Sequence, residues 1–197
     1  MHKVKTFLWV IILLLTISSC APVDLSTDEG VLEAINRRQD EPLELDDLCI
    51  KRFDELQNII LIGFFAYDVG CQYEEIYVGN RFGSIDEMTP RGLEENGWQD
   101  ESNREALALL WARKVLYSDG DRRIINSEPD VFAEHGERYT KPDAKLQSDG
   151  SVKLSFWSAV DWDMSNESVF SKQEMTFSPR GEPNNSKTLR KFQVSYD

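Results

Sequence analysis

Three side chains in this chain of 197 residues have a type and a setting that suit catalysis. His135 follows Glu134, and a neighbouring carboxylate can tune an imidazole as a general base. Asp161 and Asp163 place two carboxylates on either side of Trp162, a pair that suits acid–base chemistry. A single histidine in a polar loop is more often simply solvated, and such an aspartate pair more often forms a turn. The sequence therefore establishes no catalytic residue and leaves these three as candidates.

Sequence motifs for metals, phosphates and nucleophiles are absent. The chain contains no GxSxG, no HExxH, no phosphate-binding loop and no glycine-rich dinucleotide fingerprint. Asp119 and Asp121 begin like a calcium-binding loop, but Ile124 stands where that loop needs glycine and Asp130 where it needs glutamate. No spacing resembles a structural zinc site, so we expect neither a metal nor another cofactor.

The N-terminus has the layout of a secretory signal peptide. Lys3 and Lys5 precede an unbroken apolar run over residues 7–15, and small residues follow it. This run is much shorter than the roughly 20 residues that a membrane-spanning helix needs. We therefore expect residues 1–19 to be a signal peptide and the remainder to lie outside the cytoplasm.

The residues that end this segment, Ile17-Ser18-Ser19-Cys20, resemble the lipobox of bacterial lipoproteins. The resemblance implies that Cys20 carries a diacylglyceryl group and becomes the first residue after cleavage. Ala21 is not the aspartate that retains many enterobacterial lipoproteins in the inner membrane, so the resemblance implies an outer-membrane anchor facing the periplasm. In a Gram-positive cell, it would imply the outer face of the plasma membrane. The alternative is an ordinary signal peptide with an incidental cysteine.

Lipidation of Cys20 would leave two of the three cysteines, Cys49 and Cys71. An even pair in an oxidising compartment favours a disulfide, which would stabilise the fold by roughly 3 kcal/mol through loop closure. The alternative is two buried, unpaired thiols.

The charge balance restricts the class of partner. With 35 acidic and 22 basic side chains, the chain has a formal net charge of −13, which makes nucleic-acid binding very improbable. Ordinary solubility explains such a surface, and a basic partner attracted by electrostatic steering is the more specific explanation. We expect a lipidated tether over residues 20–27 and one extracytoplasmic domain over residues 28–197.

The first half of the mature chain mixes helical and strand patterns. Ser26 and Glu29 have capping-box spacing and predict a helix over residues 27–39. Apolar spacing predicts a second helix over residues 43–56. The apolar residues 58–67, a turn and residues 72–78 predict a hairpin of strands. Residues 89–97 predict a helical turn, and residues 103–117, with Ser102 as the cap, predict the clearest helix in the chain.

The last 60 residues favour an antiparallel meander. Ser148-Asp149-Gly150 is a hairpin signal between residues 139–146 and the strand that begins at Val152. Alternation predicts that Val152 and Phe156 face a core, while Trp157 and Asp161 face either a pocket or solvent. Further strands are expected over residues 169–177 and 189–196. The pattern predicts an α+β fold, with helices on one face of a curved sheet, by architectural analogy with cystatin-like and NTF2-like domains.

These observations favour a lipid-anchored envelope protein that acts as a non-enzymatic binding or protein-interaction domain. Its partner would be basic, as for an inhibitor or immunity protein. The alternatives are a small extracytoplasmic enzyme that uses Asp161, Asp163 or His135 as its base, and an accessory subunit of an envelope assembly.

Overall fold

The computed structural model describes residues 23–66, 70–117, 122–162, 166–184 and 186–196, which belong to two compact units divided after Asp47. The first unit contains helix α2 (Asp28–Asn36) and the 3-10 turn η2 (Leu45–Asp47). The predicted first helix is thus confirmed. Its N-cap, however, is Thr27, whose hydroxyl accepts from the Gly30 amide at 3.1 Å, and not the predicted Ser26.

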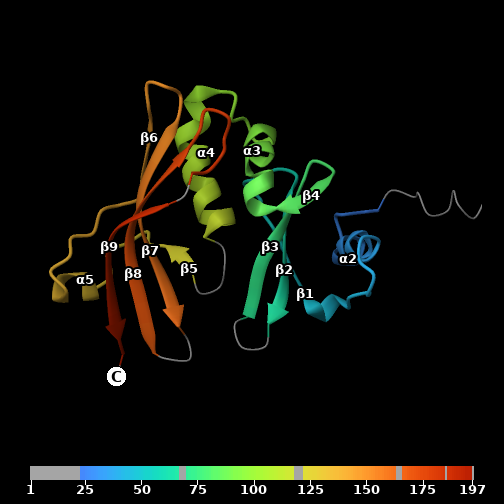
Figure 1. Ribbon diagram of the computed structural model, residues 1–197, viewed down its shortest axis with the longest axis horizontal. Coiled ribbons are helices and arrows are strands. Elements are labelled where there is room, and N and C mark those ends of the chain that lie inside the picture. Colours follow the sequence, from blue (N-terminus) through green and yellow to red (C-terminus); the bar gives the residue numbers. More distant parts are fainter. Residues whose placement is uncertain (1–22, 67–69, 118–121, 163–165, 185, 197) are drawn as a thin grey trace, which may run out of the picture. The chain divides into compact units, whose positions relative to one another are not determined.

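The second unit contains two antiparallel sheets (Figure 1). The first has the order β1-β2-β3-β4, and its strands are β1 (Leu48–Arg52), β2 (Ile59–Ala66), β3 (Gly70–Val78) and β4 (Arg81–Ser84). The second has the order β5-β7-β8-β9, with β6 also paired to β7; its strands are β5 (Arg122–Ile124), β6 (Asp143–Leu146), β7 (Val152–Trp162), β8 (Glu167–Phe177) and β9 (Lys187–Ser195). The predicted α+β fold with a C-terminal meander is confirmed, with its strands divided between two sheets.

Strand β1 corrects the prediction of a helix over residues 43–56. Its residues pair in register with β2, from Leu48 opposite Phe64 to Arg52 opposite Ile60. The apolar spacing fits a helix equally well, but a helix would leave this edge of the very apolar β2 unpaired. Strand pairing, which depends on a distant segment, decides the local conformation.

The predicted disulfide joins Cys49 of β1 to Cys71 of β3, with their Cα atoms 5.7 Å apart. Both strands pair with β2, so the bond connects the two neighbours of the same strand. The register of β2 against β3 shifts between Ile62 and Gly63, where a side chain on Gly63 would collide with the backbone oxygen of Gln72. Glycine is therefore needed where the two strands approach most closely.

Helix α3 (Ile85–Glu95) begins earlier than the helical turn predicted over residues 89–97. Ser84 caps it by accepting from the Glu87 amide, and Pro90 lies inside the helix and not at its first position. The missing proline N–H costs one helical hydrogen bond. The Ser84 cap and the buried residues Met88, Thr89, Gly92 and Leu93 stabilise the helix around this proline.

The predicted central helix is confirmed as three consecutive parts: η3 (Glu101–Asn103), α4 (Arg104–Trp111) and the π-helical turn η4 (Ala112–Leu116). Asp100, and not Ser102, caps its start by accepting from the Ser102 amide. None of the described helices is long and apolar enough to cross a membrane. A short helix α5 (Val131–Glu134) precedes β6.

Each central helix packs on a different sheet, α3 against β3 and β4, and α4 against β6 and β7 (Figure 1). The main core lies between them and includes Trp98, Trp111 and Phe156, all at most 1% exposed. The predicted core face of β7 is thus confirmed for Val152 and Phe156, and Leu154 between them is buried as well.

The opposite face of β7 is also buried in part. Trp157 is fully buried in a second cluster with Phe132 of α5, Phe170 of β8 and Phe192 of β9. This corrects the expectation that Trp157 faces a pocket or solvent. Helix α5 covers this part of the sheet through Phe132, and no local sequence pattern predicted so short a helix.

Candidate functional site

Asp161 lies near the end of β7 with both carboxylate oxygens engaged. One oxygen forms an ion pair with Arg123 of β5, and the other accepts a hydrogen bond from the Ser168 hydroxyl at 2.7 Å. A carboxylate whose two oxygens are already bound is less available as a general base. Its sequence neighbour Asp163 lies outside the described residues, as does the lipidation candidate Cys20.

His135 ends helix α5 and is exposed. Its ring stacks on Phe192, with centroids 5.0 Å apart and an angle of 26° between the planes. His135 contacts Phe192, whereas Asp161 contacts Arg123 and Ser168, and the described residues show no hydrogen bond or ion pair between the two candidates.

The structure contains instead a groove that sequence reasoning missed. It has a volume of about 520 Å³ and lies over the outer face of strands β6, β7 and β8. Every lining residue is polar or charged: Thr140, Lys141, Asp143, Lys145, Gln147, Lys153, Ser155, Lys172 and Glu174. A groove of this composition favours a water-soluble, hydrogen-bonding ligand over an apolar one.

Strand register brings the lysines of the groove together. Lys145 of β6 lies opposite Lys153 of β7, and Lys172 of β8 lies opposite Trp157 of β7. Lys141 joins them from the segment that precedes β6. The hairpin signal at residues 148–150 predicts the first pairing, but the register of β7 against β8 depends on the fold.

Two of the four lysines have carboxylate partners inside the groove. Lys153 lies 2.9 Å from Glu174, and Lys145 lies 3.4 Å from Asp143. Lys141 and Lys172 form no ion pair with any other residue that the structure describes. The groove therefore has two more positive than negative side chains, although the whole chain has a net charge of −13.

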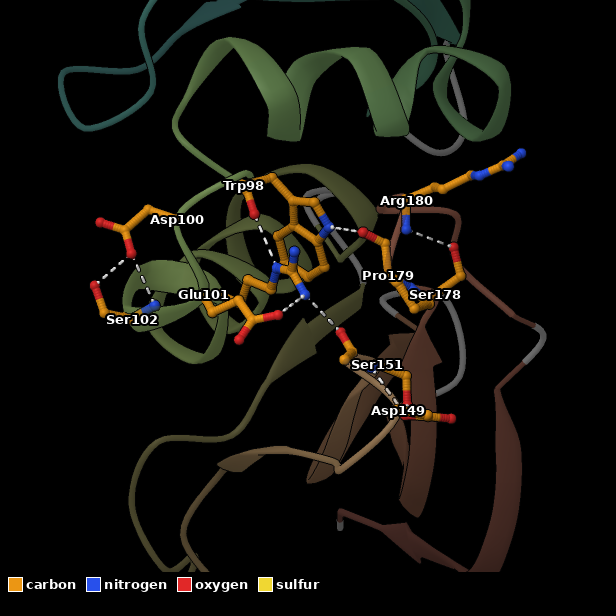
Figure 2. A network of polar contacts seen from close by, with 11 residues as sticks. Trp98, Asp100, Glu101, Ser102, Asp149, Ser151, Ser178, Pro179 and Arg180 are labelled. Carbon is orange, nitrogen blue, oxygen red and sulfur yellow. Dashed lines mark hydrogen bonds and ion pairs between the residues drawn. The ribbon is translucent and has the colours of Figure 1, made fainter.

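A buried arginine network fixes the hairpin that carries one end of this groove (Figure 2). The Arg104 guanidinium donates to the backbone oxygen of Trp98 at 2.9 Å and to that of Gly150, in the β6–β7 turn, at 2.9 Å. The Trp98 indole N–H in turn donates to the Pro179 oxygen at 3.0 Å. These bonds tie the start of α4 to two turns of the second sheet.

The β6–β7 turn has two further fixed points. Glu105 of α4 accepts from the Leu146 amide at 2.7 Å, which holds the last residue of β6 against the helix. Asp149 accepts from the hydroxyl and the amide of Ser151, and these bonds hold the pKa of its carboxyl below the ordinary value. The turn that connects two of the groove's strands is thus held by hydrogen bonds to α4 and within the turn itself.

Metal binding has no candidate among the described residues, where no three His, Cys, Asp or Glu side chains are grouped to hold an ion. No protein-family model, curated protein or solved structure matches this chain.

Proposed function

We propose that this protein is a lipid-anchored protein of the cell envelope whose folded part binds a basic protein partner without catalysing a reaction. Cys20 would hold it in the membrane, and the outer membrane facing the periplasm is the proposed location. The lipobox and the signal-peptide layout support the anchor and the compartment. The Cys49–Cys71 disulfide is consistent with an oxidising compartment.

The distribution of acidic side chains carries the proposal of a basic partner. No aspartate or glutamate that the structure describes is buried, so the negative charge faces solvent. Helix α3 illustrates this, since Asp86, Glu87, Glu94 and Glu95 are all exposed. A surface of this kind accelerates the encounter with a cationic protein through long-range attraction.

The state of Asp161 favours binding over the enzymatic alternative. A general base needs a free lone pair beside a pocket that admits substrate. Asp161 is paired with Arg123, and it does not line the groove described above. The proposed anchor and the exposed negative charge are both accounted for by binding to a partner, and neither requires a catalytic activity.

Crosslinking in intact envelopes tests the proposal. We expect the wild-type chain to capture a protein of high isoelectric point, and we expect the yield to fall several-fold when NaCl rises from about 50 mM to 500 mM, because salt screens exposed charges. A matched Cys20→Ser chain should lose lipid labelling, and its capture should fall if the partner lies in the envelope. Capture of acidic proteins only, or a yield that does not respond to salt, would contradict the proposal.

A further inference from the structure

The lysine-lined groove has an excess of positive side chains, whereas the whole chain has a net charge of −13. The groove therefore suits an anionic ligand and not the proposed basic protein partner. Its volume of about 520 Å³ lies within the range of small-molecule sites, roughly 300–1,000 Å³. Each of the described residues that line it is polar or charged, so a ligand must supply hydrogen bonds to compete with water.

Apart from the paired Lys145 and Lys153, the lining side chains divide into two chemical groups. Lys141 and Lys172 have no carboxylate partner among the described residues, and an ammonium without a partner is a natural contact for an oxyanion. Asp143 and Glu174 accept hydrogen bonds, Gln147 both donates and accepts, and Thr140 and Ser155 offer hydroxyls. This second group is suited to the hydroxyl groups of a sugar.

We propose that this groove binds an acidic carbohydrate, with the carboxylate of a uronic acid on Lys141 and Lys172 and the sugar hydroxyls on the acidic and amide side chains. Lys145 and Lys153 are already paired with Asp143 and Glu174, whose carboxylate oxygens can accept hydrogen bonds from sugar hydroxyls. The charge excess in the groove therefore comes from Lys141 and Lys172, the two lysines without an ion-pair partner among the described residues.

The elements around the groove fix its shape before any ligand arrives. Three hydrogen-bonded strands form its floor, and the Arg104 and Glu105 contacts hold the β6–β7 hairpin against α4. A site built on rigid strands loses little conformational freedom on binding.

Isothermal titration of the full chain, purified in detergent, tests the proposal. The probe is trigalacturonate, and the comparison ligands are the neutral trisaccharide maltotriose and inorganic phosphate. We expect trigalacturonate to bind with a Kd between about 10 μM and 1 mM. Maltotriose and phosphate should each bind at least about tenfold more weakly, because each supplies only one of the two kinds of contact.

Matched variants locate the site. The double variant Lys141→Gln/Lys172→Gln should weaken trigalacturonate binding about tenfold or more. Lys191→Gln, an exposed lysine of β9 outside the groove, changes charge in the same way and should leave the Kd within about twofold. Far-UV circular dichroism and the midpoint of urea unfolding check that each variant is folded.

Several results would overturn the proposal. They are no heat of binding with trigalacturonate, equal binding of maltotriose, equal binding of phosphate, and equal loss in the Lys191→Gln control. None of these depends on the basic protein partner, which is captured in envelopes and not in this titration. Loss of that partner would leave the groove proposal standing.

Discussion

The Cys49–Cys71 disulfide is a single covalent contact that spans 22 residues of sequence. The bond closes a loop that contains all of β2. Reduction opens this loop and so raises the conformational entropy of the unfolded chain. We expect the double variant Cys49→Ser/Cys71→Ser to lose about 3 kcal/mol of unfolding free energy in urea titrations.

Reduction of the wild-type protein should reproduce this loss, and it serves as the control for the two serine substitutions. Non-reducing peptide mass mapping should recover Cys49 and Cys71 in one linked species. Two free thiols in the purified, non-reduced protein would contradict the assignment.

Tyr117 gives the molecule a specific sensitivity to alkaline pH. Its ring is 5% exposed and lies edge-on to Phe156, and its hydroxyl donates to Gln173. Burial raises the pKa of Tyr117 above its ordinary 10.0, although a hydrogen bond with Ser186 and the charge of Arg122 act against this. The Tyr117 hydroxyl therefore loses its proton at a higher pH in the folded state than in the unfolded state.

The sign of the pH effect follows from this difference. The contribution of Tyr117 is complete below the ordinary tyrosine pKa of 10.0 and is lost as pH rises through the higher folded pKa. We expect urea unfolding between pH 9 and pH 11 to show a smaller loss of stability in Tyr117→Phe than in the wild type. Tyr196→Phe, at an exposed position, should keep the wild-type slope, and identical slopes in all three proteins would refute the effect.

At the scale of elements, helices α3 and α4 meet through a glycine and a tryptophan. A side chain on Gly92 would overlap the six-membered ring of Trp111, and the Trp111 indole N–H donates to the Thr89 hydroxyl at 3.1 Å. Gly92→Ala raises helix propensity, which alone would stabilise α3 by about 1 kcal/mol. We expect the steric overlap to dominate and to destabilise the protein by about 1–3 kcal/mol in urea unfolding.

A substitution on the exposed face of the same helix separates packing from propensity. Glu94→Ala also raises helix propensity, but it meets no buried partner. It should change the unfolding free energy by no more than about 0.5 kcal/mol. A stabilised Gly92→Ala variant would show that the two helices do not approach as closely as described.

The hydrogen bonds of Arg104 are a second set of contacts between elements. Arg104 is 7% exposed and joins α4 to the β6–β7 turn, so its removal leaves two backbone carbonyls without their donor. We expect Arg104→Ala to cost about 2–4 kcal/mol of unfolding free energy. Arg180→Ala is the matched control, because the Arg180 side chain extends away from the network (Figure 2) and should contribute less than about 0.5 kcal/mol.

At the scale of the whole molecule, the excess negative charge opposes folding. The chain carries a net −13, and the carboxylates that the structure describes all lie outside the core. Like charges are closer together in the folded state, and salt screens them over a Debye length of about 10 Å at 0.1 M. Raising NaCl from about 10 mM to 200 mM should therefore raise the thermal midpoint by a few degrees, as measured by circular dichroism.

Sodium sulfate at equal ionic strength separates screening from anion-specific effects, since sulfate also strengthens apolar burial. A midpoint that falls with NaCl would mean that attractive ion pairs, such as Arg190–Glu137, outweigh the repulsion.

The sequence alone determined the features that depend on neighbours along the chain. Alternation and the turn at residues 148–150 predicted the C-terminal meander. Apolar spacing predicted the helices that begin near Asp28 and Arg104, although their caps are Thr27 and Asp100 and not the predicted serines. The two cysteines left after Cys20 predicted the pairing that the structure contains. These signals are local or compositional, so no knowledge of distant contacts was needed.

Tertiary structure decided whatever depends on which distant segments meet. Residues 48–52 became a strand because β2 offered an unpaired edge, although their spacing also fits a helix. Trp157 became a core residue because α5 and the strands β8 and β9 cover it. Asp161 was engaged by Arg123 of another strand, and the register of β7 against β8 added Lys172 to the groove. Registers and side-chain neighbours of this kind depend on pairing between segments far apart in sequence, and a one-residue change in register would move each side chain to the opposite face.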